Sequence, residues 1–355
     1  MSSPNLPARL EAGELPSEAE LAGFIAGHSG AEREALFAAA RRVREAHYGR
    51  DVFIRGLIEF TNFCCNDCFY CGIRAGNRAV SRYRLAPEVI LDCCRYGYRY
   101  GFRTFVLQGG EDFGFSDDAM TRLVAAIRSA FPDCAITLSV GERPRAVYQA
   151  WFDAGADRYL LRHETATPEH YAKLHPARQT WTERIRCLHD LREVGYQVGA
   201  GFMVGSPGQT PEMLAHELHF LHDFRPEMVG IGPFLPHHAT PFRDEPAGSC
   251  ETTLVMLALI RLVLPDVLLP ATTALATGDP KGRVKGLLAG ANVVMPNLSP
   301  ADVRGDYLLY DNKVTSGSEA ADAVRLLAAE FAEAGFRIVT DRGDCRRGRE
   351  HHVAQ

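Results

Sequence analysis

The chain has 355 residues, of which 46% are hydrophobic and 23% charged, and it carries a formal net charge of -5. This composition predicts a globular protein with one large domain or two small ones. Acidic and basic residues are interspersed, and no apolar run reaches the roughly 18 residues that a membrane span needs, so we expect neither nucleic-acid nor membrane binding. Residues 1–7 lack the pattern of an export signal, and ten cysteines then indicate a reducing, cytoplasmic compartment.

Residues 1–50 are expected to form an N-terminal helical extension. Ser17 is a candidate N-cap with Glu20 three residues later, which is the pattern of a capping box. A second helix is predicted from about residue 31 to residue 47.

From residue 51 onward, short β-branched segments alternate with amphipathic ones, which predicts an α/β fold. Strands are expected at residues 53–60, 104–108, 135–139, 158–161, 197–202, 228–231, 267–270 and 292–295. Helices are expected at residues 86–99, 116–130, 144–154, 180–194, 210–223, 250–264 and 279–288. Eight units over about 250 residues favour a complete (β/α)8 barrel of the TIM type over an open doubly wound sheet. We assign residues 51–310 to this barrel and residues 311–355 to a C-terminal helical segment and tail packed on it.

The most informative motif follows the first predicted strand, where Cys64, Cys68 and Cys71 have the spacing C-x3-C-x2-C. Three thiolates can hold three corners of a [4Fe–4S] cluster and leave one iron open, a spacing typical of radical S-adenosylmethionine (SAM) enzymes. Electron-transfer clusters normally use four cysteines. A structural zinc site also closes with four ligands. Cys65 is poorly placed beside Cys64 to be the fourth, so zinc stays the minor alternative.

The ends of the predicted strands carry the second signal, because active sites of such barrels lie at the carboxyl ends of the strands. Polar, glycine-rich segments follow most of the strands, whereas the helix-to-strand turns are ordinary. Glycines would let the backbone approach the amino group of SAM, and an arginine could hold its carboxylate. Glu164 could accept the ribose hydroxyls, and Tyr70 could stack on adenine.

Long stretches of the chain, beyond these single residues, resemble the HydE family of [FeFe]-hydrogenase maturases, which are radical SAM enzymes. Biotin synthase and methylornithine synthase are similar but more distant. The resemblance covers roughly residues 50–310, and its matching stretches are residues 58–62, 68–74, 81–84, 106–112, 155–165, 199–201, 203–205, 207–210, 228–234, 270–274 and 290–297.

The resemblance implies a closed internal cavity with the cofactors at its top, and it adds to the residues chosen from the strand ends. The catalytic cluster ligands would be Cys64, Cys68 and Cys71. The SAM-binding residues would be Tyr70, Gln108, Gly109, Gly110, Glu111, Ser139, Glu164, Arg184 and Met203. The substrate would lie against Arg55, Thr137, Arg158, Met228, Thr272, Thr273 and Tyr307.

The resemblance further implies that a 5′-deoxyadenosyl radical acts on an anionic, cysteine-bound iron carbonyl cyanide complex during assembly of the hydrogenase H-cluster. Expected partners are the maturase that delivers this complex, a scaffold maturase, and a reductant protein such as ferredoxin or flavodoxin. Some family members carry a second cluster near the C-terminus. None is expected here, because residues 307–325 contain no cysteine and Cys345 stands alone.

Two other functions stay open at this point. A radical SAM mutase or synthase acting on an amino acid, similar to methylornithine synthase or biotin synthase, would need carboxylates at the cavity floor, where the candidate residues are arginines and threonines. A non-catalytic iron–sulfur or zinc protein would not need the glycine-rich strand ends. A family member in an organism without the hydrogenase could also act on another substrate.

Overall fold

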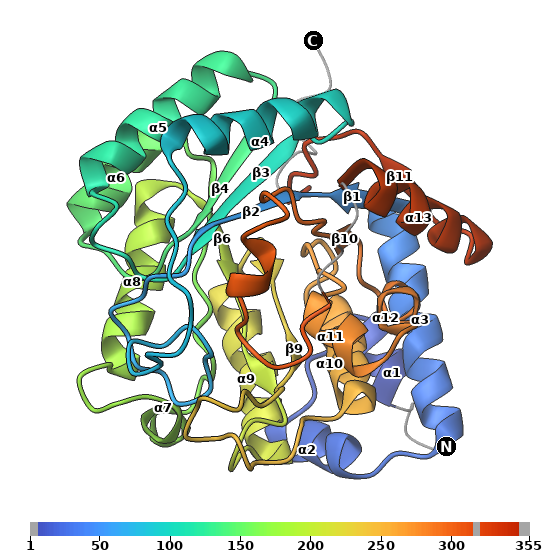
Figure 1. The fold of residues 1–355 in the computed structure, drawn as a ribbon. Helices are drawn as coiled ribbons and strands as arrows, with labels where there is room; N and C mark the ends of the chain where they lie inside the picture. The colour runs from blue at the N-terminus through green and yellow to red at the C-terminus, as the bar shows by residue number, and fades with distance from the viewer. Residues whose placement is uncertain (1–5, 315–319, 348–355) are drawn as a thin grey trace.

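The computed structural model of the protein describes residues 6–314 and 320–347 (Figure 1). Parts of the expected terminal segments, namely residues 1–5, 315–319 and 348–355, lie outside the described residues.

Three helices precede the first strand: α1 (Leu6–Glu11), α2 (Glu18–Ala26) and α3 (Gly30–Tyr48). The capping box predicted at Ser17 is confirmed, because the Ser17 hydroxyl accepts the Glu20 N–H at 3.3 Å while the Glu20 carboxylate accepts the Ser17 N–H at 3.0 Å. Ser29 and Glu32 repeat the same arrangement at the start of α3. Helix α2 packs on α9 (Pro211–Phe224) and α3 packs on α10 (Cys250–Val263), so this segment covers one side of the molecule.

The strands are parallel, and six of them form one continuous sheet in the order β2-β3-β4-β5-β6-β8. A second sheet has the order β10-β1-β11, and a short pair joins β7 to β9. The strands are β1 (Asp51–Ile54), β2 (Gly56–Thr61), β3 (Thr104–Gly109), β4 (Ala135–Ser139), β5 (Arg158–Leu160), β6 (Gln197–Ala200), β7 (Met203–Val204), β8 (Met228–Val229), β9 (Gly232–Pro233), β10 (Val293–Val294) and β11 (Arg337–Val339).

Isolated parallel bridges link the two larger sheets. Met228 of β8 pairs with Leu268, and Pro270 pairs with Val293 of β10. On the other side, β1 and β2 follow one another with only Arg55 between them, and Leu57 of β2 pairs with Asn297 just beyond β10.

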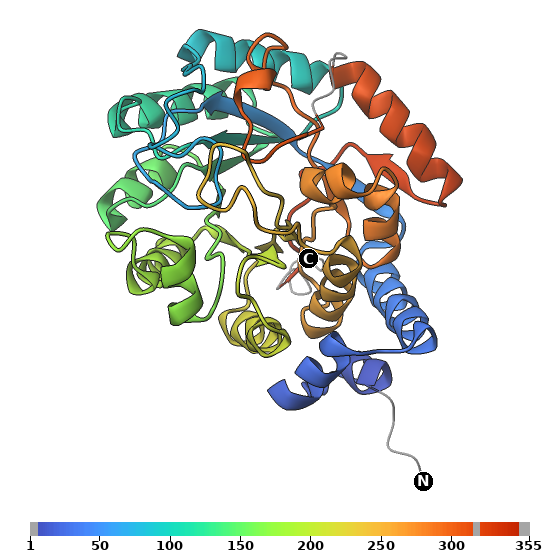
Figure 2. The same ribbon diagram turned by 60° about the horizontal axis from the view of Figure 1, so that its bottom comes forward.

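Helices surround the strands on the outside (Figure 2). Four of them begin within one residue of the predicted start, where Ser116, Thr180, Thr210 and Ser249 each accept a backbone N–H of the first turn. The helices are α4 (Pro87–Arg99), α5 (Asp117–Ala130), α6 (Arg145–Asp153), α7 (Pro168–Leu174), α8 (Trp181–Val194), α9, α10, α11 (Thr273–Gly278), α12 (Gly282–Leu288) and α13 (Ala320–Glu333), with a 3-10 turn at Arg304–Asp306.

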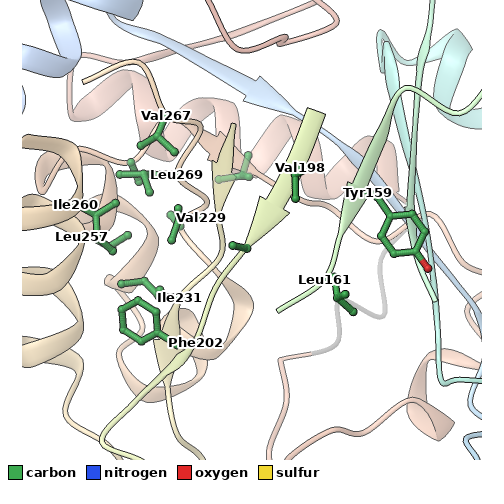
Figure 3. Packing of buried hydrophobic residues seen from close by; sticks show 14 of the residues in the cluster. Tyr159, Leu161, Val198, Phe202, Val229, Ile231, Leu257, Ile260, Val267 and Leu269 are labelled. Carbon is green, nitrogen blue, oxygen red and sulfur yellow. The ribbon is translucent and has the colours of Figure 1, made fainter. Parts of the chain in front are cut away.

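Alternate residues of each strand face opposite sides, as the two-residue period of a strand requires. Val229 and Leu269 point outward into the main hydrophobic core, toward the side of α10 that carries Leu257 and Ile260 (Figure 3). Their neighbours Met228 and Leu268 belong to a separate inner cluster. The side chains of Met228 and Leu268 thus lie on the inner face of the strands, opposite to the face that packs on the helices.

Several elements differ from the prediction. Helices α7 and α11 and the strands β7, β9 and β11 were not expected, and residues 267–270 form bridges rather than a strand of their own. These elements are short, so their sequence periodicity is too weak to detect. Strand β11 depends on pairing with β1, nearly 300 positions away, which local sequence cannot specify.

The C-terminal segment runs across the amino ends of the strands after β11. The Arg342 carbonyl accepts the Thr104 hydroxyl at 2.7 Å and an Arg158 N–H at 2.8 Å, and Asp344 lies 2.5 Å from Arg158 Nη2. Further along, Cys345 Sγ lies 3.2 Å from the Asp266 carbonyl oxygen. Residues 342–347 thus cover the end of the strands opposite to the predicted active site.

Within the described ranges, 6–314 and 320–347, no helix is both long and apolar enough to cross a membrane.

Candidate active site

A cavity of about 550 Å³ lies at the carboxyl ends of the strands. It gathers residues from most strand ends, although these segments are far apart in the sequence. All three motif cysteines and every residue predicted to bind SAM line this cavity: Cys64, Cys68, Cys71, Tyr70, Gln108, Gly109, Gly110, Glu111, Ser139, Glu164, Arg184 and Met203.

The cysteine loop between β2 and α4 is held against the end of β3 by backbone contacts. The Cys65 N–H donates to the Glu111 carbonyl at 2.9 Å, and the Gly110 N–H donates to the Thr61 carbonyl at 3.2 Å. A Cβ atom at Gly110 would lie 2.1 Å from the Phe63 carbonyl oxygen and 2.7 Å from Cys64 Cβ. Only glycine permits this close approach, so Gly110 fixes how near the loop lies to the sheet.

The three motif thiols fit a cationic iron–sulfur group. Burial raises the pKa of Cys68 to about 12 and the pKa values of Cys64 and Cys71 above the usual range. The negative charges of neighbouring thiolates also raise the pKa values of Cys68 and Cys71, so positive iron would offset both effects. Backbone and side-chain N–H groups already point at the sulfurs, from Glu111 to Cys64 Sγ at 3.4 Å and from Gln179 to Cys68 Sγ at 3.6 Å.

The spacing of the thiols disfavours a single zinc ion. Tetrahedral zinc with Zn–S bonds of about 2.3 Å brings sulfurs within roughly 3.8 Å of one another. Among the described residues, the one group of three or more potential ligands whose atoms all lie within 4.8 Å of one another is His237, His238 and Asp311, so the cysteine thiols are spread more widely. Cys65 does not line the cavity.

The His237 group is itself a hydrogen-bonded cluster. The His237 Nδ1 atom accepts the Ala239 N–H at 3.0 Å, which leaves the ring proton on Nε2, and His238 Nδ1 lies 2.8 Å from an Asp311 carboxylate oxygen. A Cβ atom at Gly72, next to Cys71, would lie 2.4 Å from the His237 ring. This cluster therefore packs against the cysteine loop at Gly72, next to Cys71.

Glu111 connects the cysteine loop to the loop after β4. Its carboxylate accepts the Asn66 side-chain N–H at 2.9 Å and the Glu142 backbone N–H at 3.0 Å. Gly141 has a φ of 81°, and a Cβ atom there would lie 2.2 Å from the Glu111 carboxylate. Burial raises the pKa of Glu111. Glu111 thus positions loops around the cavity and faces it at the same time.

Glu164 has a carboxylate that is available to a ligand. Its φ is 65°, in the left-handed region that non-glycine residues rarely adopt, and the strain of such residues is concentrated at functional sites. The Glu164 Oε2 atom forms no hydrogen bond and lies 3.1 Å from Arg162 Nη2. Arg184 differs, because its guanidinium already contacts Glu142 and the Arg162 carbonyl, each at 2.5 Å.

Tyr70 is oriented by a histidine that sequence reasoning did not identify. The Tyr70 hydroxyl lies 3.1 Å from His175 Nε2, and His175 Nδ1 lies 3.0 Å from the Tyr171 carbonyl oxygen. Burial lowers the pKa of His175 to about 3, so the ring is neutral and accepts the Tyr70 hydroxyl proton through Nε2.

The predicted substrate residues are divided between two cavities. Thr272, Thr273 and Tyr307 line the large cavity, and the Gln108 side-chain amide donates to the Tyr307 hydroxyl at 3.4 Å. The other four predicted substrate residues line a second cavity of about 10 Å³ toward the amino ends of the strands: Arg55, Thr137, Arg158 and Met228. That volume holds about one water molecule, not a metal complex. The expectation that all seven residues line one cavity is therefore corrected.

The charge of this second cavity is partly balanced from within the chain. Arg158 forms an ion pair with Asp344, and both side chains are at most 6% exposed. Arg55 donates to the Gly343 carbonyl at 3.4 Å and contacts the Met228 sulfur. The C-terminal segment that supplies these partners carried no sequence signal for such a role.

The large cavity also contains charged residues that the sequence did not single out. Lys313 Nζ lies 2.5 Å from a Glu59 carboxylate oxygen, and the Asn297 side chain donates to the other oxygen at 2.8 Å. Tyr310 and Arg283 line the same cavity. Glu59 could have been found from its place on the inner face of β2, whereas Lys313 lies in a loop without a pattern.

Comparison with known proteins places the chain in a family. Residues 58–221 match the model of the radical SAM superfamily. The [FeFe] hydrogenase maturase subunit HydE of Thermotoga maritima is 48% identical over 283 residues, covering 79% of this chain and 80% of the relative. The 3-methylornithine synthase of Methanosarcina acetivorans is 31% identical, over 81% of this chain and 80% of the relative.

A solved structure of methylornithine synthase (PylB) superimposes with a TM-score of 0.83 at 25% identity, covering 94% of this chain and 97% of that one. With the parallel sheet described above, this likeness supports an α/β fold of the TIM type. Membership of the superfamily implies a [4Fe–4S] cluster and SAM as cofactors. The chain belongs to the HydE family of hydrogenase maturases within the radical SAM superfamily, and it is a radical SAM enzyme.

Proposed function

We propose that this enzyme cleaves SAM at a cluster held by Cys64, Cys68 and Cys71 and acts on an anionic, cysteine-bound iron carbonyl cyanide complex in H-cluster assembly. The observation that carries the proposal is the single cavity that brings the three thiols together with every strand-end residue chosen for SAM. The 48% identity to a hydrogenase maturase supports the substrate class. When bound, the cluster and SAM supply a 5′-deoxyadenosyl radical by one-electron cleavage of the C5′–S bond.

The chain's own residues bind and position the reactants. Glu164 Oε2, which has no hydrogen-bond donor, accepts ribose hydroxyl groups. Tyr70, held by His175, presents its ring to adenine, and the glycines after β3 allow close approach of the methionine part. The buried walls keep water away from the reacting atoms.

We further propose that the barrel is complete and forms one domain over residues 51–310, with residues 1–50 and 311–355 packed on it. The bridges at Leu268, Pro270 and Leu57 support closure, since they join the two edges of the main sheet through β10 and β1. Proposed partners are a ferredoxin or flavodoxin as reductant and the other hydrogenase maturases. We also propose that the protein binds no second iron–sulfur cluster.

Anaerobic reconstitution followed by assay for 5′-deoxyadenosine tests the activity. Wild type is expected to bind iron and release 5′-deoxyadenosine, and Cys68→Ser is expected to lose at least about 99% of this cleavage because one cluster corner is missing. Cys65→Ser is the matched control, since its thiol neighbours the motif but does not line the cavity. Zinc without iron, or undiminished cleavage by Cys68→Ser, would contradict the proposal.

A further inference from the structure

The positive side chains of the large cavity differ in whether they already have a partner. Arg162 lies beside Glu164, Arg184 contacts Glu142, and Lys313 contacts Glu59. Arg283 also lines this cavity, yet within the described ranges it has no hydrogen bond and no ion pair. A half-buried guanidinium without such partners has five N–H donors available to a ligand.

The position of Arg283 is fixed by its neighbours. It lies in the first turn of α12, directly after Gly282, where a Cβ atom would lie 2.3 Å from the Leu275 carbonyl oxygen of α11. The start of α12 is thus pressed against the helix that begins at Thr272 and Thr273. Because the two threonines line the same cavity, α11 and α12 together present hydroxyl and guanidinium donors to it.

The electrostatic surroundings compensate the charge of Arg283 only in part. Burial lowers its pKa, while Glu330, which lines the same cavity without forming an ion pair with Arg283, and Tyr310 raise it. Tyr310 is itself buried, and its pKa is raised to about 12, so it is neutral at physiological pH. An anionic ligand beside Arg283 would replace the lost hydration of the guanidinium.

The amino-end arginines do not offer the same opportunity. Arg158 is paired with Asp344, and the cavity beside it and Arg55 has a volume of only about 10 Å³. We therefore infer that Arg283, with the hydroxyls of Thr272 and Thr273, binds the carboxylate of the substrate in the large cavity. This inference rests on the proposed function, which supplies a substrate whose cysteine carries such a carboxylate.

Calorimetric titration of the anaerobically reconstituted protein tests this assignment. The probe is S-methyl-L-cysteine, in which a methyl group replaces the iron, and the matched ligand is 2-(methylthio)ethylamine, which lacks the carboxylate. Wild type is expected to bind the amino acid about 10- to 100-fold more tightly than the amine, the range of a charge-assisted hydrogen-bonded pair. Arg283→Gln should remove this preference, and Arg283→Lys should retain part of it.

The control variant is Arg122→Gln, because Arg122 is an exposed arginine of α5, outside the cavity, and should leave the preference unchanged. A second measurement needs no variant at all. Phenylglyoxal should modify Arg283 of the wild type, and S-methyl-L-cysteine should protect it at least about fivefold while leaving Arg122 unprotected.

Equal affinity of wild type and Arg283→Gln for S-methyl-L-cysteine, no binding by wild type, or no protection of Arg283 would overturn the inference. If Arg283→Gln fails to fold, the protection experiment decides. Failure of the proposed function is seen separately, as absence of 5′-deoxyadenosine formation by wild type.

Discussion

The two ends of the strands use the same residue type for opposite purposes. At the amino ends, the buried Arg158 is neutralised by Asp344 and the remaining space is about 10 Å³. At the carboxyl ends, a cavity of about 550 Å³ is lined by Arg283, which forms no ion pair with any described residue. An arginine inside this fold is therefore not by itself a sign of substrate binding, and what distinguishes Arg283 from Arg158 is that the chain supplies an ion-pair partner for Arg158 alone.

Removing the carboxylate at the amino ends should have the largest effect on stability. Asp344→Asn leaves Arg158 buried without a counter-charge, and breaking a buried pair in this way costs about 3–5 kcal/mol. Urea denaturation monitored by circular dichroism measures the change in the free energy of unfolding. Asp302→Asn is the control, because Asp302 is exposed.

A double variant sharpens the same comparison. Replacing both Arg158 and Asp344 by leucine should restore most of the loss, since two apolar side chains leave no charge buried. A stability of Asp344→Asn within about 0.5 kcal/mol of wild type would show that the pair does not seal the amino ends.

At the carboxyl ends, the most sensitive backbone position should be Gly110. Gly110→Ala forces the added Cβ against Phe63 and Cys64, so the cysteine loop must move and overpacking should cost about 1–3 kcal/mol. We expect iron incorporation to fall several-fold, as measured by iron analysis after reconstitution. Gly230→Ala is the control, because the nearest atom to its added Cβ would be the Ala200 oxygen at 4.0 Å. Equal iron content in the two variants would contradict the assigned role.

A smaller and pH-dependent effect is expected from His175. Its pKa is about 3 in the folded protein, where burial, Arg184 and His170 oppose the protonated form, against the usual 6.5 when unfolded. Below pH 6.5 the unfolded chain takes up a proton that the folded chain refuses, so stability falls as pH decreases toward 3. This contributes at most about 1.4 kcal/mol per pH unit.

Chemical denaturation at pH 7.0, 6.0 and 5.0 measures this slope. His175→Gln should flatten it, whereas His189→Gln, at an exposed position of α8, should leave it as in wild type. An unchanged slope in His175→Gln would mean that Tyr70 is not held by a neutral histidine.

Much of the fold could be predicted because its signals are local. Ser116, Thr180 and Thr210 are N-caps, and apolar residues recur with helical spacing in the segments that follow them. The long strands have continuous β-branched runs. Strand β11 and the bridges around Leu268 could not be predicted, since they depend on partners distant in sequence.

The candidate site divides in the same way. The cavity-lining positions of the cysteine motif and of residues such as Gln108 and Glu164 follow from their place at strand ends. Arg158 was predicted to line the substrate cavity, whereas it lines the small cavity at the amino ends, because sequence shows neither depth along a strand nor the arrival of Asp344. Arg283 belongs to no sequence motif. It can be identified as a candidate ligand-binding residue only from the structure, where it lines the large cavity without an ion-pair partner.

The ion pair between Arg158 and Asp344 also has a consequence for biosynthesis. The two residues are 186 positions apart, so at about 5–20 residues per second the ribosome makes Arg158 roughly 10–40 s before its carboxylate partner. During that interval the nascent strands hold a guanidinium that cannot be buried without penalty. The amino ends of the strands can therefore be covered only after residues 342–347 have been translated. Docking of this segment is then a late step in the formation of the native state.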